Sequence, residues 1–185
     1  FKEYPMKSRE TYRLTGLVQG VGFRPTLWRT AKRLHLTGCV YNDAQGVTAV
    51  VEGDAEQLAL FSETLRRDVA REAPLARIDG IERVRIEAPR GDTDFVITES
   101  RAGRARTLVT PDAATCPACT REIFDPQNRR YRYAFTNCTH CGPRFTITRR
   151  IPYDRQTTSM AGFTMCPACR REYDDPADRR FHAQP

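Results

Sequence analysis

The sequence predicts an α+β protein in two parts: a ferredoxin-like βαββαβ sandwich followed by a small irregular domain. The first part is patterned as alternating strands and helices. Residues 1–100 carry 15 basic against 15 acidic residues and residues 101–185 carry 15 against 8, so the net charge of +7 lies in the second part. Six of the seven cysteines also lie there. We place the first domain at 8–100, a linker at 101–112 and the second domain at 113–185.

The first domain begins with a strand, because residues 11–18 ("TYRLTGLV") are rich in β-branched and aromatic side chains. A glycine-rich loop follows, and then a helix over 24–36, whose apolar residues recur at helical spacing and whose first turn contains Pro25. Two strands at 38–43 and 46–53 are predicted to form a hairpin around the turn "DAQG".

A second helix follows the hairpin. Asp54 and Gln57 form a capping box at its start, and its apolar stripe is Leu58, Phe61, Leu65 and Val69. A strand at 76–88 and a short strand at 94–100 close the domain. The resulting order, βαββαβ with one short extra strand, is the split βαβ arrangement.

Composition limits the class of protein. A content of 39% hydrophobic and 9% aromatic residues is typical of a globular protein. No apolar run approaches the roughly 20 residues of a membrane span, and no signal pattern opens the sequence. We therefore expect a cytoplasmic protein without membrane contact. We take a native start near Met6 and leave the residues before it out of the fold prediction.

The loop in "GLVQGVGFRP", residues 16–25, indicates an anion site. Gly16, Gly20 and Gly22 leave backbone N–H groups free to point into one concavity, to which the following helix adds its positive end. Such a nest binds a phosphate-sized anion, and Arg24 adds a planar guanidinium. Taken alone, the loop is more typical of a plain tight turn beside a solvated arginine.

Residues 16–53 together resemble the acylphosphatase signature, in which the loop GxVQGVGFR precedes a strand that ends in an asparagine before a small turn. The resemblance covers roughly residues 9–99. It implies that Arg24 binds phosphate and that Asn42 orients the attacking water. It also implies a phosphate cradle of backbone amides from Gln19, Gly20, Val21, Gly22 and Phe23. Asn42 by itself is also typical of a turn.

This resemblance implies hydrolysis of an acyl phosphate. Because an acyl phosphate has a good leaving group, an enzyme needs only to hold the phosphoryl oxygens, neutralise their charge and aim a water at phosphorus. Neither a cysteine, a histidine nor a metal ion is required for that chemistry.

The second domain contains three Cys-x2-Cys pairs: the first pair is Cys116 and Cys119, the second is Cys138 and Cys141, and the third is Cys166 and Cys169. The separation of the first two pairs is typical of zinc sites. Disulfides are less expected in a reducing cytoplasm, and three successive pairs argue against a thioredoxin-type redox motif. We predict structural zinc, because four thiolates leave no position open for water.

An internal repeat leaves the metal pairing open. Residues 116–131 and 166–181 align without a gap at an offset of 50 residues. In the first alternative, each repeat closes its own site, so the first and second pairs share a zinc, and the third pair has His182 as a further candidate ligand. In the second alternative, the second and third pairs share a zinc. The same offset places a fourth pair just beyond Pro185, so we expect the chain to stop short of it.

The acylphosphatase signature, the linker "TLVTPDAATCPAC" and the paired fingers with "NCTHCGPRFTI" together resemble the N-terminal portion of the hydrogenase-maturation carbamoyltransferases, the HypF family. The resemblance implies that the first domain splits carbamoyl phosphate into carbamate and phosphate. It further implies that later domains use ATP to pass the carbamoyl group to the C-terminal cysteine of a maturation partner protein.

Two other functions stay open. Zinc knuckles with arginine doublets at 129–130, 149–150, 170–171 and 179–180 also fit a nucleic-acid-binding module, although aromatic residues are not interleaved with them as a stacking platform needs. The second open function is that of a general acylphosphatase with a zinc-binding tail. We favour carbamoyl phosphate hydrolysis over both.

Overall fold

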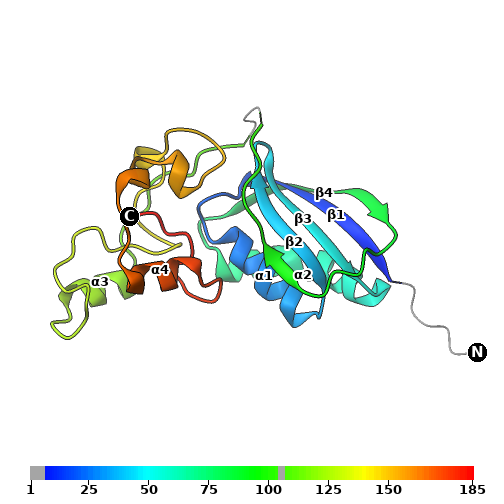
Figure 1. The fold of residues 1–185 in the computed structure, drawn as a ribbon, viewed down its shortest axis with the longest axis horizontal. Coiled ribbons are helices and arrows are strands. Elements are labelled where there is room, and N and C mark those ends of the chain that lie inside the picture. The colour runs from blue at the N-terminus through cyan, green and yellow to red at the C-terminus, as the bar shows by residue number, and fades with distance from the viewer. Residues whose placement is uncertain (1–6, 104–106) are drawn as a thin grey trace, which may run out of the picture.

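The computed structural model describes residues 7–103 and 107–185. The two parts of the chain lie side by side, with the sheet-containing part at one end and α3 and α4 at the other (Figure 1). The proposed start at Met6 and the linker residues 104–106 lie outside the described residues.

The first part is built on a five-stranded sheet with the order β4-β1-β3-β2-β5. Its strands are β1 (Ser8–Leu17), β2 (Thr37–Asp43), β3 (Gly46–Gly53), β4 (Arg77–Glu87) and β5 (Phe95–Ile97). The first four strands pair antiparallel, and only the short edge strand β5 runs parallel to its neighbour β2. This topology confirms the predicted ferredoxin-like order.

Two helices, α1 (Phe23–Arg33) and α2 (Ala55–Glu72), cover one face of the sheet (Figure 1). The capping box forms at the start of α2, where the Gln57 side chain accepts a hydrogen bond from the Asp54 amide at 3.0 Å. All four predicted stripe residues of α2 are buried in the core between helices and sheet: Leu58, Phe61, Leu65 and Val69.

Helix α1 ends at Arg33, three residues before the predicted end. The chain takes a left-handed conformation at His35, with φ of 55°, and the Leu36 amide then donates to the Ala31 carbonyl at 2.9 Å. This closure satisfies a carbonyl of the last turn in the way that a C-terminal glycine usually permits. Because a histidine occupies the position, the sequence carries no stop signal there.

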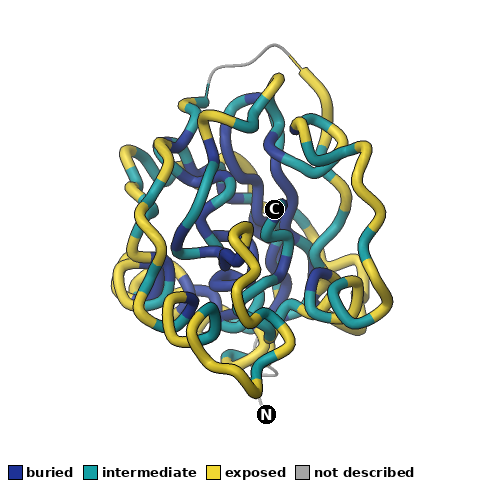
Figure 2. The backbone as a smooth tube through the Cα atoms, turned by 90° about the vertical axis from the view of Figure 1, so that its left-hand side faces the viewer, coloured by how far each residue is buried: buried dark blue, intermediate teal, exposed yellow. Residues whose placement is uncertain are grey.

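The second part is irregular, as predicted. It contains two short helices, α3 (Pro117–Phe124) and α4 (Pro167–Asp174), and three 3-10 helices, η1 (Phe145–Ile147), η2 (Arg155–Thr157) and η3 (Ser159–Gly162). Helices α3 and α4 each begin at the proline that follows the first cysteine of a pair, a position where the missing N–H costs no hydrogen bond. Seen from the side of the second part, the buried segments run through the middle of the molecule, behind exposed loops (Figure 2). None of the described helices is long and apolar enough to cross a membrane.

Candidate functional site

The glycine-rich loop between β1 and α1 carries backbone donors without acceptors. Gly20 and Gly22 have φ angles of 71° and 76°, in the left-handed region that favours glycine. Within the described parts of the chain, no group accepts a hydrogen bond from the amides of the five predicted cradle residues, Gln19, Gly20, Val21, Gly22 and Phe23. Buried backbone N–H groups are almost always paired in proteins. Free donors at the positive end of α1 are therefore suited to a bound anion.

Arg24 stands at the end of this loop and is only 7% exposed. Its Nη2 donates to Asp154 Oδ1 at 3.3 Å and lies 3.2 Å from His182 Nδ1. Burial opposes ionisation of Asp154, but the neighbouring His182 and the charge of Arg24 outweigh it, so the pKa of this carboxyl lies below its usual range. The second part of the chain thus supplies the counter-charge of the predicted phosphate-binding arginine.

Asn42 lies at the end of β2 and is fully buried. Its Nδ2 donates to the Tyr153 carbonyl at 3.4 Å, which fixes the orientation of the amide. Its Oδ1 is buried and has no hydrogen-bond partner among the described residues. An unpartnered buried acceptor is uncommon and is typical of a position that binds a water or a substrate. This geometry fits the predicted water-orienting role.

The side chain of Gln19 joins three parts of the site. Its Nε2 donates to the carbonyls of Asp43 and Gly46 at 2.7 Å and 2.8 Å, and its Oε1 accepts from the Tyr153 amide at 2.8 Å. The glycine loop, the β2–β3 turn and the second part are therefore linked through one buried amide. The sequence predicted a role only for the Gln19 backbone.

The second part covers the site almost completely. A cavity of about 20 Å³ remains at the loop, enough for about one water molecule. From the second part, it is lined by Thr139, Arg144, Tyr153, Phe181 and His182. An acyl phosphate therefore enters only when side chains of the second part move. These covering residues were missed, because no periodicity or local motif in one sequence links them to a loop more than 100 positions away.

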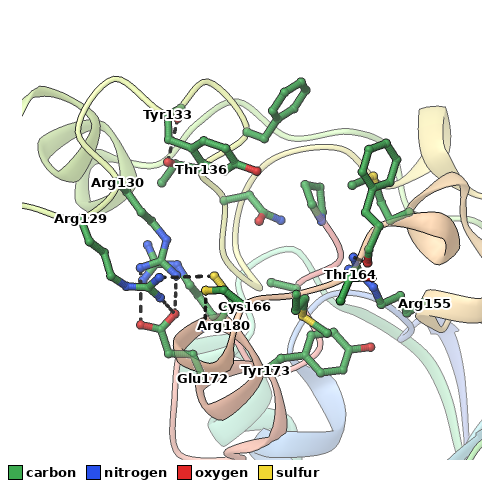
Figure 3. Close-up of a pocket in the computed structure, with 18 residues that line it drawn as sticks. Arg129, Arg130, Tyr133, Thr136, Arg155, Thr164, Cys166, Glu172, Tyr173 and Arg180 are labelled. Carbon is green, nitrogen blue, oxygen red and sulfur yellow. Dashed lines mark hydrogen bonds and ion pairs between the residues drawn. The ribbon is translucent and has the colours of Figure 1, made fainter.

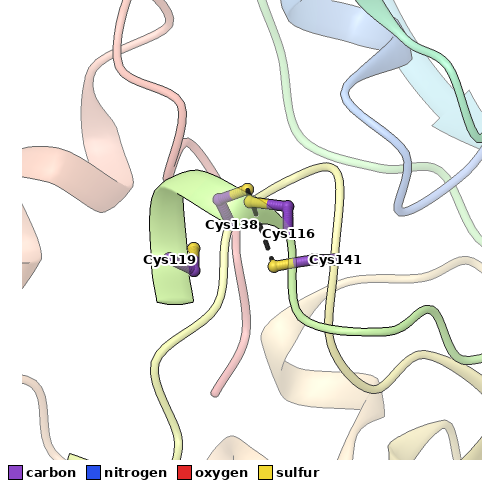
Figure 4. Close-up of side chains that lie close together, drawn as sticks. All are labelled: Cys116, Cys119, Cys138 and Cys141. Atoms are coloured by element: carbon purple, nitrogen blue, oxygen red, sulfur yellow. Dashed lines mark hydrogen bonds between the residues drawn. The ribbon is translucent and has the colours of Figure 1, made fainter. Parts of the chain in front are cut away.

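The structure gathers the first and second cysteine pairs. All four Sγ atoms lie within 4.8 Å of one another (Figure 4). The Sγ of Cys138 lies 3.8 Å from those of Cys116 and Cys141, close to the roughly 3.8 Å that separates ligands in a tetrahedral zinc site with Zn–S bonds of about 2.3 Å. The hydrogen bond from Cys138 lowers the pKa of Cys141 below that of a free thiol. The donor set and its spacing fit zinc.

The third pair lies apart from this cluster. In the described ranges, the first and second pairs form the only group of at least three metal-ligating side chains close enough to hold an ion. Cys166 is exposed, and the Cys169 Sγ accepts from Arg129 Nη1 at 3.3 Å. The structure thus brings together the four cysteines required by the pairing in which the first repeat closes its own site. His182 lies against Arg24, not beside the third pair.

The two repeats bind each other reciprocally. Arg129 and Arg130 of the first repeat pair with Glu172 of α4 beside a cavity of about 530 Å³ (Figure 3). Arg179 and Arg180 of the second repeat pair with Glu122 of α3. The cysteine contact is duplicated too, since Arg179 Nη1 donates to Cys119 Sγ at 3.1 Å, as Arg129 does to Cys169.

This reciprocity gives two of the four arginine doublets a structural partner. One member of each, Arg130 and Arg180, has a side chain only 11% exposed. Each of these doublets shares one glutamate, which compensates one of its two positive charges inside the second part. These two doublets are therefore less available to bind a nucleic acid than four fully exposed doublets would be.

The comparisons with known proteins cover both parts. Residues 10–97 match the acylphosphatase family, and residues 115–148 and 165–185 match the HypF finger. The HypF carbamoyltransferase of Rhodobacter capsulatus is 55% identical over 176 residues, which are 94% of this chain and 22% of that protein. The chain belongs to the HypF family. It spans about a fifth of the length of the curated HypF relatives that it matches.

Two further relatives agree with this assignment. The acylphosphatase of Moorella thermoacetica is 39% identical over 93 residues, which are 50% of this chain and 95% of that protein. A crystal structure of full-length HypF in a phosphate- and nucleotide-bound form is 43% identical, with a TM-score of 0.91 over 100% of this chain and 24% of that one. The similarity to HypF thus extends over both parts in one arrangement.

Proposed function

We propose that the chain binds an acyl phosphate at the glycine loop and hydrolyses it, with carbamoyl phosphate as the substrate in the HypF setting. The observation that carries the proposal is the group of loop amides without acceptors among the described residues, beside the buried Arg24. Free amides and a guanidinium together match a phosphoryl group with several negatively charged oxygens. Membership of a family named for carbamoyl transfer supports the choice of acyl group.

Each residue has a separate task in the reaction. The amides of 19–23 hold the phosphoryl oxygens, and the guanidinium of Arg24 binds them through two parallel N–H groups. Asn42 Oδ1 accepts a hydrogen bond from a water and aims its oxygen at phosphorus. As that oxygen bonds to phosphorus, the bond from phosphorus to the acyl oxygen breaks. Carbamate leaves, and phosphate remains in the cradle.

Substrate binding requires a rearrangement at Arg24. The Asp154 carboxylate bonds to the guanidinium from which a phosphoryl oxygen would accept, and the cavity beside it holds only about one water. We infer that the phosphoryl group replaces Asp154 on Arg24. The Asp154 side chain then turns away from the loop while Gln19 keeps its bonds to the β2–β3 turn.

The cysteine pairs have a structural role in this proposal. Cys116, Cys119, Cys138 and Cys141 would hold one zinc, which cross-links the irregular second part where the apolar core is small. Cys166 and Cys169 occupy the equivalent place in the second repeat, and we propose them as metal ligands too. Reduced thiols suit a cytoplasmic location.

The later steps belong to the longer protein. We propose that the carbamate formed here is activated with ATP and passed to the C-terminal cysteine of a partner protein, as the family resemblance implies. The HypF structure that resembles this chain was itself nucleotide-bound.

Phosphate release from carbamoyl phosphate tests the proposal. Replacing Arg24 by Ala removes a charge-assisted bidentate contact and should lower the rate by about 10²-fold or more. Arg24→Lys should restore little, because lysine lacks the planar fork. Arg67→Ala is the matched control, since Arg67 is 70% exposed on α2. Near-normal hydrolysis by Arg24→Ala would rule the site out, and equal rates with bulky acyl phosphates would favour a general acylphosphatase.

A further inference from the structure

Arg144 connects the four-cysteine cluster directly to the glycine loop. It follows the second pair in sequence and is only 2% exposed. Its Nη2 donates to the Cys138 carbonyl at 2.9 Å, and its Nη1 donates to the carbonyls of Cys141 and Pro143 at 2.9 Å and 3.0 Å. Its Nε donates to the Gly20 carbonyl. One guanidinium thus bonds to the backbone of the second pair and to the backbone of the loop.

The charge of Arg144 has no carboxylate partner in the described parts of the chain. Asp112 binds the Arg144 backbone amide at 2.7 Å, whereas the guanidinium bonds only to carbonyl oxygens. A buried charge is costly unless a nearby negative charge compensates it. Four thiolates around a divalent metal carry a net charge of −2, and a phosphoryl group in the cradle is also negative. Both neighbouring sites therefore supply compensating charge when they are filled.

The bond to Gly20 also sets the direction of a cradle donor. In a trans peptide, the carbonyl of one residue and the N–H of the next point in opposite directions. Within the described residues, the Ile151–Pro152 bond is the only cis peptide, so the bond between Gly20 and Val21 is trans. Holding the Gly20 carbonyl therefore fixes the direction of the Val21 amide, which is one of the proposed phosphate donors.

We propose that Arg144 is a positioning residue through which the metal bound by the first and second pairs raises the affinity of the loop for phosphate. The metal holds the second pair rigid, the carbonyls of that pair hold the guanidinium, and the guanidinium orients the loop. The proposal rests on the proposed function, because it needs phosphate to bind at the loop. Since binding coupling is reciprocal, bound phosphate must tighten metal binding by the same factor.

The experiment measures both halves of the coupling on the intact chain. Inorganic phosphate is titrated by calorimetry into zinc-loaded, chelator-treated and zinc-restored protein, and zinc affinity is measured by competition with a chromogenic chelator with and without phosphate. We expect phosphate to bind at least tenfold more weakly without zinc, to recover when zinc is restored, and to strengthen zinc retention by a matching factor. The phosphate titration and the zinc competition both use the unmodified chain, so this part of the test does not depend on whether any variant folds.

Variants then assign the coupling to Arg144. Arg144→Gln should retain zinc in the loaded protein but reduce the coupling factor toward one, and Arg144→Lys should restore only part of it. Arg179→Gln is the matched control, because Arg179 contacts Cys119 Sγ and, among the described residues, does not bond to the glycine loop. This variant should alter zinc retention and leave the coupling factor intact.

The outcomes separate this inference from the proposed function. If zinc-loaded protein binds no phosphate, or binds it equally well with Arg24→Ala, the proposed function fails and the coupling fails with it. If phosphate binding depends on Arg24 but not on zinc, the coupling alone is overturned. If Arg144→Gln leaves the coupling factor unchanged, then Arg144 is not the residue that couples zinc binding to phosphate binding.

Discussion

Replacing Gly20 by Ala is a sharp test of how tightly the second part covers the loop. At φ of 71° a Cβ atom costs about 1–2 kcal/mol on conformation alone. The same Cβ would lie 2.8 Å from Cδ1 and Cε1 of the Tyr153 ring, closer than real Cβ contacts. Overpacking of this kind costs about 1–3 kcal/mol. The sum predicts a loss of roughly 2–5 kcal/mol in the free energy of unfolding.

Gly91→Ala separates the two contributions. Gly91 has φ of 80°, and a Cβ there would have no atom within 4 Å. It therefore reports the conformational cost together with the change in unfolded-chain entropy, which is the same at both positions. Urea denaturation should show that Gly20→Ala is the more destabilising change by about 1–3 kcal/mol, the cost of the ring contact.

A Tyr153→Ala background completes the design. With the ring removed, Gly20→Ala should cost no more than Gly91→Ala, and the double-mutant cycle then gives the contact energy directly. Equal costs for the two glycines, or an unchanged cost in the Tyr153→Ala background, would refute the tight contact between the loop and the second part.

Four further substitutions test the site and the repeats. Asn42→Ala should lower turnover of carbamoyl phosphate about 10²-fold while inhibition by phosphate stays nearly unchanged, because this side chain aims the water and does not hold the phosphoryl group. Steady-state kinetics with phosphate as the inhibitor measures both quantities. An equal loss of turnover and of phosphate affinity would show that the role is wrong. Asp154→Asn should tighten phosphate binding in calorimetry, because the carboxylate no longer competes for the guanidinium, and weaker binding would contradict the exchange. Glu122→Gln and Glu172→Gln should each cost about 1.5–3 kcal/mol in urea denaturation, as expected for charged hydrogen bonds, whereas the exposed Glu63→Gln should be nearly neutral.

The same two glutamates predict a pH dependence of stability. Burial opposes ionisation of Glu122 and Glu172, but hydrogen bonds from the arginine doublets outweigh it, so the pKa of each carboxyl is lowered. A lowered folded pKa stabilises the protein above the unfolded pKa, and this contribution is lost as pH falls through the folded value. Acid titration should therefore destabilise the unmodified chain more steeply than the Glu122→Gln and Glu172→Gln variants. Parallel acid profiles would contradict this assignment.

Local patterns made part of the site predictable. The spacing of glycines before Arg24, the asparagine at the end of β2 and the two-residue gap within each cysteine pair are all properties of short segments. Their physical meaning, a backbone nest, a turn and a metal-binding knuckle, depends on a few neighbouring residues only.

Contacts between distant segments were not predictable from one sequence. Asp154 and His182 reach Arg24 from irregular segments whose position depends on how the second part packs. The arginine doublets showed their charge in the sequence but not their partners, because only the folded repeats bring them to Glu122 and Glu172. The contacts of Arg144 with the glycine loop likewise form only once the folded chain brings the second pair beside that loop.

The central claim is that the loop and Asn42 direct a water at phosphorus. Its most direct test is hydrolysis of carbamoyl phosphate by the intact chain in water enriched in oxygen-18. We expect each phosphate released above the protein-free blank to carry a single oxygen-18 atom, seen as an isotope shift by phosphorus-31 NMR. Enzyme-dependent phosphate without solvent oxygen would show that the bond between carbon and oxygen breaks, and would contradict attack of the water at phosphorus.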